Sequence, residues 1–204
     1  MPQGGAAPPG NAGAQASADA LARLVAGNDI ALSVLGADRH GRVLARAYLK
    51  GGGTWRPVEV ELIGAGQAFV SPYATTQNCA NDLKAAERRA RVGKLGLWAD
   101  PYYAAKDADS TDSLLAAQGR FAVVEGKVAS VRESGATIYV NFGRRWSEDF
   151  TVTIAKRNER LFAESGLAVK SLAGRRVRVR GTIEARGGPW IEAVAPGQIE
   201  LADR

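Results

Sequence analysis

The chain has 204 residues, of which 46% are apolar and 24% charged, so it can bury an ordinary core and wholesale disorder is excluded. One cysteine and one histidine, His40, exclude an internal disulfide and a Cys/His zinc cluster, and no window approaches the roughly 18 consecutive apolar residues of a membrane span. The net charge of +6 favours polyanionic partners.

The amino-terminal third is expected to contain a tail, a helix and a hairpin. Residues 1–16 are almost all Gly, Ala, Pro, Asn and Gln without charge, which is typical of a loop or disordered segment. Ser17 can then cap a short helix. Strands over 29–35 and 42–49, joined by a turn, predict a β-hairpin.

Two further helices and a linker follow. Pro57 suits the start of a short helix through Ile63, and a longer helix is expected from Asn81 to Lys94. Residues 104–118 carry one positive and three negative charges with little periodicity, so we interpret them as a linker.

The last 86 residues, 119–204, are dominated by β-branched and aromatic side chains. We expect strands over 121–131, 137–142, 150–154, 176–183 and 190–201, with a helix over 157–166 between the third and fourth. Three strands, a helix and two strands are typical of an OB-type barrel. The predicted fold class is therefore α+β, mostly β, with a small five-stranded OB-like barrel after the linker.

Several pieces in the first half share an order with a known family. DRHGR at 38–42 is followed by VLARAYL, then VEVELIGAGQAFV, then AAERRARVGKLGLWADP. This succession resembles the second half of a staphylococcal-nuclease-like (thermonuclease) domain, which we place at residues 17–103. The resemblance implies calcium-dependent hydrolysis of phosphodiesters in DNA and RNA, and Arg42 matches the second of the family's two catalytic arginines.

The remaining catalytic parts of that family have no counterpart in this sequence. In the family, the first arginine, the catalytic glutamate and the calcium-binding aspartates precede the first helix, whereas the first acidic residue here is Asp19. Two explanations stay open: the chain is amino-truncated, or it lost its catalytic half and survives as a binding module. We therefore expect this chain to hold no metal or other cofactor, although the complete family domain uses calcium.

The carboxy-terminal module supplies the candidate binding residues. YVNFG, DFTVTI, RRVRVRGTI and GPWIEAVAPGQIEL resemble the OB-like domain that accompanies some bacterial nuclease-like proteins. Such a module could bind single strands through guanidinium groups and aromatic faces. The candidates are a basic and aromatic loop and an alternating row: Arg144, Arg145, Trp146, Arg176, Arg178 and Arg180, with Tyr139 and Phe142. Alternatively, the aromatic residues belong to the core and the arginines are merely solvated.

Tyr73 lies where the family places aromatic residues near the nucleotide, with core packing as the alternative. The predicted function is a nuclease-family protein acting on nucleic acid, inactive as supplied because its general base and metal ligands are missing. A non-catalytic nucleic-acid-binding or protein-interaction module is the alternative. No signal peptide follows Met1, and the resemblance favours a periplasmic or secreted protein only if a leader was lost.

Overall fold

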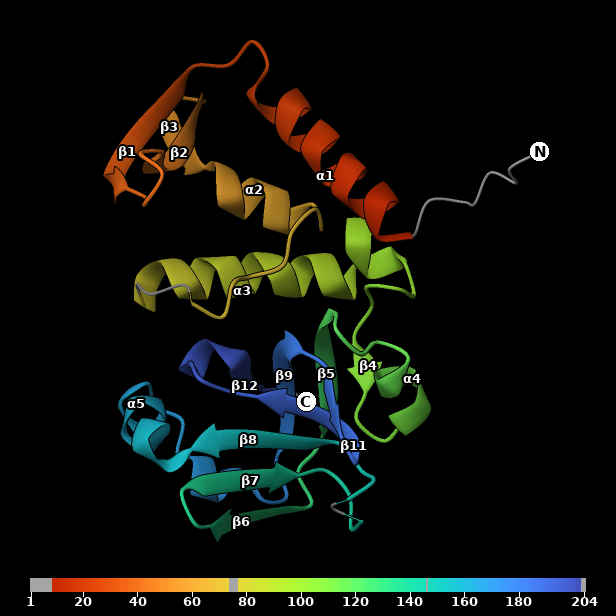
Figure 1. Cartoon of the computed structure of the whole chain (residues 1–204). Helices are drawn as coiled ribbons and strands as arrows, with labels where there is room; N and C mark the ends of the chain where they lie inside the picture. Colours follow the sequence, from red (N-terminus) through yellow and green to blue (C-terminus); the bar gives the residue numbers. More distant parts are fainter. Residues whose placement is uncertain (1–8, 74–76, 146, 203–204) are drawn as a thin grey trace, which may run out of the picture. The chain divides into compact units, whose positions relative to one another are not determined.

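The computed structural model describes residues 9–73, 77–145 and 147–202. Its contacts divide the chain into two compact units (Figure 1). Unit 1 comprises Met1–Val70 and Thr75–Tyr102, and unit 2 comprises Ser71–Ala74 and Tyr103–Arg204. Among the helices of the described ranges, none is both long enough and apolar enough to cross a membrane.

Unit 1 combines helices with a three-stranded antiparallel sheet in the order β1-β2-β3. Its elements in chain order are α1 (Pro9–Val25), β1 (Ile30–Ala37), β2 (Val43–Gly51), β3 (Thr54–Pro57), α2 (Val58–Gly64), α3 (Gln77–Val92) and a 3-10 turn, η1 (Gly96–Ala99). The predicted hairpin is β1 and β2, with Ile30 opposite Leu49 and Ala37 opposite Val43. The short helix after Pro57 is α2, and the longer helix is α3.

The start of α1 corrects one prediction. The helix begins at Pro9, so residues 9–16 are helical rather than part of a loop that reaches Ser17. Proline is tolerated in the first turn of a helix, and alanine is the best helix former, so an uncharged stretch rich in alanine can extend a helix. Composition alone could not separate this helix from a tail.

The two sides of unit 1 differ in how much apolar surface they bury. Helix α2 packs against α3, and Ile63, Ala86 and Trp98 are at most 5% exposed. On the sheet, by contrast, Leu32 and Val34 are 62% and 65% exposed. The core of this unit therefore lies between its helices and not over its sheet.

Unit 2 contains two sheets with the orders β10-β11-β8-β7-β6 and β12-β9-β5-β4. Its strands are β4 (Lys106–Asp107), β5 (Phe121–Lys127), β6 (Ser130–Ser134), β7 (Thr137–Asn141), β8 (Thr151–Ala155), β9 (Arg176–Thr182), β10 (Glu184–Arg186), β11 (Gly188–Glu192) and β12 (Ile199–Leu201). Two helices, α4 (Thr111–Leu115) and α5 (Glu159–Glu164), accompany them. The predicted placement of a helix between the third and fourth long strands is confirmed.

Two chain segments turn from one sheet into the other. Strand β5 continues into β6 across a corner where the Val128 N–H bonds Arg175 O and the Ala129 N–H bonds Asn141 O. Strand β9 likewise continues into β10 through Ile183. The described ladders therefore form two sheets joined at corners, instead of the single closed barrel that the sequence predicted.

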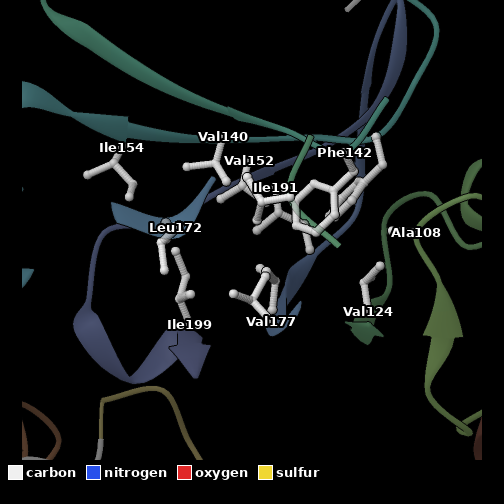
Figure 2. Close-up of a cluster of buried hydrophobic side chains, with 14 of the residues drawn as sticks. Ala108, Val124, Val140, Phe142, Val152, Ile154, Leu172, Val177, Ile191 and Ile199 are labelled. Atoms are coloured by element: carbon white, nitrogen blue, oxygen red, sulfur yellow. The ribbon is translucent and has the colours of Figure 1, made fainter. Parts of the chain in front are cut away.

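The core of unit 2 lies between these two sheets. Figure 2 shows Val140, Val152 and Ile191 of the five-stranded sheet facing Val177 and Ile199 of the four-stranded sheet. All five side chains are at most 4% exposed. Alternation along each strand sends the intervening residues to the outer faces.

The predicted linker at 104–118 is wrong, because this segment belongs to the core of unit 2. Strand β4 pairs in parallel with β5, and the side chains of Leu114 and Ala117 are fully buried. Ala108 lies against β5 so closely that a Cβ at Gly126 would sit 2.3 Å from the Ala108 Cβ. A few apolar residues among charged ones are enough to dock a short helix when a glycine lets the backbones approach.

Candidate nucleic-acid interface

The outer face of the five-stranded sheet presents polar, basic and aromatic side chains. Strands β8, β7 and β6 lie side by side in Figure 1, and their register places Thr153, Tyr139 and Arg132 in one row across them. A second row runs through Ser130, Asn141, Thr151 and Trp190. Both rows face away from the valines and isoleucines of the core.

This outer face is hollowed into a groove of about 1200 Å³. Four cations line it, namely Lys127, Arg132, Arg144 and Arg186, against two carboxylates, Asp109 and Glu133. The groove is larger than the roughly 300–1,000 Å³ of typical small-molecule pockets, so it has room for more than a compact ligand. Its lining carries more positive than negative charge.

The positive charges of the groove are largely uncompensated. Within the described ranges, Lys127, Arg132 and Arg144 form no ion pair. The carboxylate of Glu133 is held by the ammonium groups of Lys156 and Lys170, each at 2.7 Å, and hydrogen bonds from these two lysines lower the pKa of Glu133 to about 2. Because Glu133 is balanced by lysines outside the groove lining, it does little to offset the groove cations.

An aromatic pair and an arginine form a stack at one side of the groove. The rings of Tyr139 and Trp190 meet edge to face with centroids 6.1 Å apart, and the guanidinium carbon of Arg186 lies 5.0 Å from the centroid of the Trp190 ring. We call Tyr139, Trp190 and Arg186 the aromatic–arginine stack. The indole nitrogen of Trp190 is buried and has no hydrogen-bond partner among the described residues, so ring contacts rather than hydrogen bonds fix this side chain.

The floor of the groove is polar. The Asn141 amide donates to Ser130 Oγ at 3.3 Å, and the Thr151 hydroxyl donates to Asn141 Oδ1 at 3.4 Å. Both hydrogen bonds are long and therefore weak. Asn141 and Thr151 are only 5% and 2% exposed, so these groups mainly hold the strands under the groove together.

The loop over 143–149 contributes only part of the basic cluster predicted there. Arg144 lines the groove, but Arg145 pairs with Glu148 at 2.8 Å within the loop, and its backbone N–H donates to Asp149 Oδ2 at 2.7 Å. Trp146 lies outside the described residues. Of the residues predicted to form a basic loop, Arg144 is therefore the one that the described structure places in the groove.

A glycine-rich turn holds this loop against the β10–β11 hairpin. A Cβ at Gly187, which has a φ of +84°, would lie 2.6 Å from Ser147 O, and one at Gly188 would lie 2.3 Å from Glu148 O. Only residues without a Cβ allow this approach of two backbones. The turn thus positions the segment that carries Arg144.

The predicted row of Arg176, Arg178 and Arg180 needs a correction. The three residues do share one outer face of β9, but Arg178 and Arg180 are 7% and 0% exposed. Arg178 donates to Glu125 Oε1 at 2.6 Å and to Glu200 Oε1, on the two neighbouring strands. These carboxylates occupy the guanidinium groups that a phosphate would need, and only Arg176 stays exposed.

Two further candidates lie elsewhere. Tyr73 is 60% exposed and is not among the groove residues. Arg42 is at the end of the β1–β2 hairpin in unit 1, with its side chain 77% exposed and its Nε 2.6 Å from Asp38 Oδ2. Hydrogen bonds from Arg42, first from its backbone and then from its side chain, lower the pKa of Asp38.

The surroundings of Arg42 do not fit a calcium ion. Asp38 Oδ1 accepts the backbone N–H groups of His40 and Arg42 at 2.8 and 2.9 Å, so the carboxylate shapes the turn. Among the described residues, no group of three or more His, Cys, Asp or Glu side chains could hold a metal ion. Calcium prefers six to eight oxygen ligands, and this turn offers one carboxylate already engaged by protein donors.

The sequence analysis named Tyr139 and Arg144 but missed Trp190, Arg186, Arg132 and Lys127, although the sequence contained a signal for Trp190. In TIYVN and PWIE, the alternation of apolar residues already sends Tyr139 and Trp190 to one face, while Phe142 packs on Phe150 in the core. Arg132, Arg186 and Lys127 are isolated bases in sequence. Only the register of the strands brings them together.

Fold and site together define a mixed α+β protein whose described residues form three sheets, one of which carries a basic, aromatic groove. Residues 8–100 match the model of the family described as staphylococcal nuclease homologue, so this part of the chain is similar to that family. The predicted resemblance is confirmed for that segment. No curated protein matches the chain significantly.

Several solved structures are similar to part of the chain. An OBody, AM1L10, bound to hen egg-white lysozyme is 23% identical over 44% of this chain and 85% of its own, with a TM-score of 0.32. A putative aspartyl-tRNA synthetase from Leishmania major Friedlin is 10% identical over 50% of this chain, with a TM-score of 0.35. The aspartyl-tRNA synthetase from Entamoeba histolytica is 14% identical over 46%, with a TM-score of 0.31. The chain spans 21% of each synthetase chain.

Proposed function

We propose that this protein acts on nucleic acid and that the groove of unit 2 binds a single strand. The observation that carries the proposal is the set of three cations without a carboxylate partner in the described ranges, Lys127, Arg132 and Arg144, in one groove with two aromatic side chains. A buried or paired arginine serves folding, whereas unpaired cations that share a groove attract an extended polyanion.

The aromatic–arginine stack favours a single strand over a duplex. Bases in a duplex are already stacked on one another, whereas an unpaired base has a free face that an aromatic ring or a guanidinium can cover. The cations of the groove supply phosphate contacts that are independent of sequence. We therefore expect binding that tolerates many sequences and weakens steeply with salt.

Unit 1 supplies the family assignment, which suggests a nuclease-like domain that acts on the same class of polymer. In this proposal Arg42 keeps the role implied by the resemblance, which is to stabilise charge on a phosphate. Its exposed guanidinium would break its ion pair with Asp38 in order to contact that phosphate. The proposal does not include hydrolysis, because no group of three or more His, Cys, Asp or Glu side chains in the described ranges could hold a metal ion. Binding is the activity that the groove supports.

Fluorescence anisotropy with a labelled 20-nucleotide single strand tests the proposal. The groove variant Arg132→Ala/Arg144→Ala is compared with Arg157→Ala/Arg160→Ala, which removes the same charge from exposed positions outside the groove lining. We expect the groove variant to bind at least tenfold more weakly at 50 mM salt and the control less than threefold.

Salt dependence gives an independent measure. Losing two phosphate contacts should reduce the slope of log K against log salt by about 1.4, since each contact with a single strand contributes about 0.7. Equal losses in both variants, or a wild-type protein that does not bind at low salt, would contradict the proposal.

A further inference from the structure

We infer that Arg186 is a stacking platform, on whose guanidinium plane one unpaired nucleobase lies. This inference rests on the proposed function, because it names how the same groove holds its polymer. It assigns Arg186 a role different from that of the other groove cations. Those would bind phosphate through charge and hydrogen bonds, whereas Arg186 would distinguish a strand with bases from a bare sugar–phosphate chain.

Three contacts hold the guanidinium of Arg186 in place. Its carbon lies 5.0 Å from the Trp190 ring centroid, and its Nε and Nη2 atoms lie 3.2 and 2.9 Å from Glu184 Oε2. Glu184 and Trp190 are directly opposite each other in the β10–β11 ladder. The β10–β11 hairpin therefore holds Arg186 through the Glu184 carboxylate and the Trp190 ring.

These contacts leave the guanidinium accessible from the groove. The Arg186 side chain is 53% exposed although it contacts both Glu184 and Trp190, and it lines the groove. Displacing Arg186 would break its two hydrogen bonds to Glu184 and its cation–π contact with Trp190.

The chemistry of arginine suits this arrangement. The guanidinium group is planar, delocalised and weakly hydrated, so it stacks on aromatic rings with either face. A base on the outer face would complete a layered order of base, Arg186 and Trp190, with Tyr139 supporting the indole ring. Unpaired bases stack on arginine planes as they do on aromatic side chains. A lysine keeps the charge at this position but has no plane.

The experiment compares Arg186→Lys with the matched variant Arg132→Lys, since both substitutions keep the charge and both residues line the groove. Each protein is titrated with a labelled oligothymidylate and with an abasic deoxyribose-phosphate oligomer of equal length. Wild type is expected to bind the oligothymidylate at least fivefold more tightly. We expect R186K to lose most of that preference with an unchanged salt slope, and R132K to keep it.

The outcomes distinguish a failure of the stacking role of Arg186 from a failure of the proposed single-strand binding. If R186K keeps the full preference for bases while wild type binds with a normal salt slope, Arg186 is not the platform and the groove still binds nucleic acid. If wild type binds both oligomers equally, the groove reads only phosphate and the inference is overturned. If wild type binds neither oligomer at low salt, both the inference and the proposed function fail.

Discussion

Arg178 of β9 forms ion pairs with carboxylates on both neighbouring strands of the four-stranded sheet. Replacing it tests how much these ion pairs stabilise unit 2. Its side chain is 9% exposed and pairs with Glu125 on β5 and Glu200 on β12, whose side chains are 25% and 16% exposed. Burial alone would lower the pKa of Arg178, but the hydrogen bonds to the two carboxylates outweigh it and raise that pKa. The arginine therefore stays charged throughout the accessible pH range.

The magnitude follows from what an Arg178→Met substitution leaves behind. The carboxylates of Glu125 and Glu200, on the two strands that flank β9, would lose the cation that lies between them. Arg180 Nη2, 3.6 Å from Glu200 Oε1, would remain as a weaker partner of Glu200 alone. Breaking a buried ion pair from one side costs about 3–5 kcal/mol, and the partial exposure of Glu125 places the expected loss near the lower end, at about 3 kcal/mol. For a unit of this size, that loss corresponds to a fall in Tm of roughly 12–24 °C.

Thermal unfolding of the full chain followed by circular dichroism measures this loss. The matched control is Arg160→Met, which breaks an ion pair with Glu164 of similar length, 2.7 Å, whose partners are 88% and 59% exposed. An exposed pair of this kind is worth at most about 0.5 kcal/mol. If R178M lowered the Tm no more than R160M, the buried pairs would be no more stabilising than a solvated contact. The claim that Arg178 serves folding through Glu125 and Glu200 would then be wrong.

Three more predictions follow from the packing and the charges. Leu114→Ala should destabilise unit 2 by about 2–5 kcal/mol in urea unfolding, because Leu114 is fully buried, whereas a residue in a mere linker would give no change. Gly188→Ala should lower the free energy of unfolding by about 1–3 kcal/mol and weaken single-strand binding in the anisotropy assay, since the new Cβ would meet Glu148 O at 2.3 Å. Gly64→Ala, whose new Cβ would make only an ordinary 3.9 Å contact, is its control. Glu133 should titrate in a carbon-detected NMR experiment with a pKa of about 2, so its stabilising contribution is fully present above about pH 4.5 and disappears as the pH falls through 2. Lys170→Ala should raise that pKa, and an unchanged pKa would show that the lysine does not hold the carboxylate.

Local sequence rules predicted the elements of this protein better than their assembly. The alternation in VLARAYL and TIYVN and the proline before α2 predicted two strands and a helix that the structure contains. The failures came from segments whose structure depends on distant partners. Ala108 packs against Gly126 of β5, which lies outside residues 104–118, so the composition of that segment alone does not predict this contact.

The candidate site shows the same limit more clearly. Strand periodicity correctly placed Arg176, Arg178 and Arg180 on one face of β9, but it could not tell which side chains neighbour that face. Glu125 is 53 positions away from Arg178 and Glu200 is 22 positions away. Whether a row of arginines binds a ligand or the protein itself is decided by cross-strand register, which a single sequence does not contain.

Comparing the two sheets of unit 2 explains why net charge misleads in such a protein. The segment 119–204 holds 15 basic and 10 acidic residues, and the acidic ones are unevenly placed. On the four-stranded sheet, the carboxylates of Glu125 and Glu200 lie directly beside Arg178 and absorb its charge. On β6 of the five-stranded sheet, Glu133 is opposite the core residue Ile138, whereas Arg132 is opposite Tyr139 on the outer face. Glu133 pairs with Lys156 and Lys170, so it does not offset the charge of Arg132. We therefore expect the denser row of arginines to bind a polyanion more weakly than the groove, because the field that a polyanion meets depends on where the carboxylates lie and not on how many arginines one strand carries.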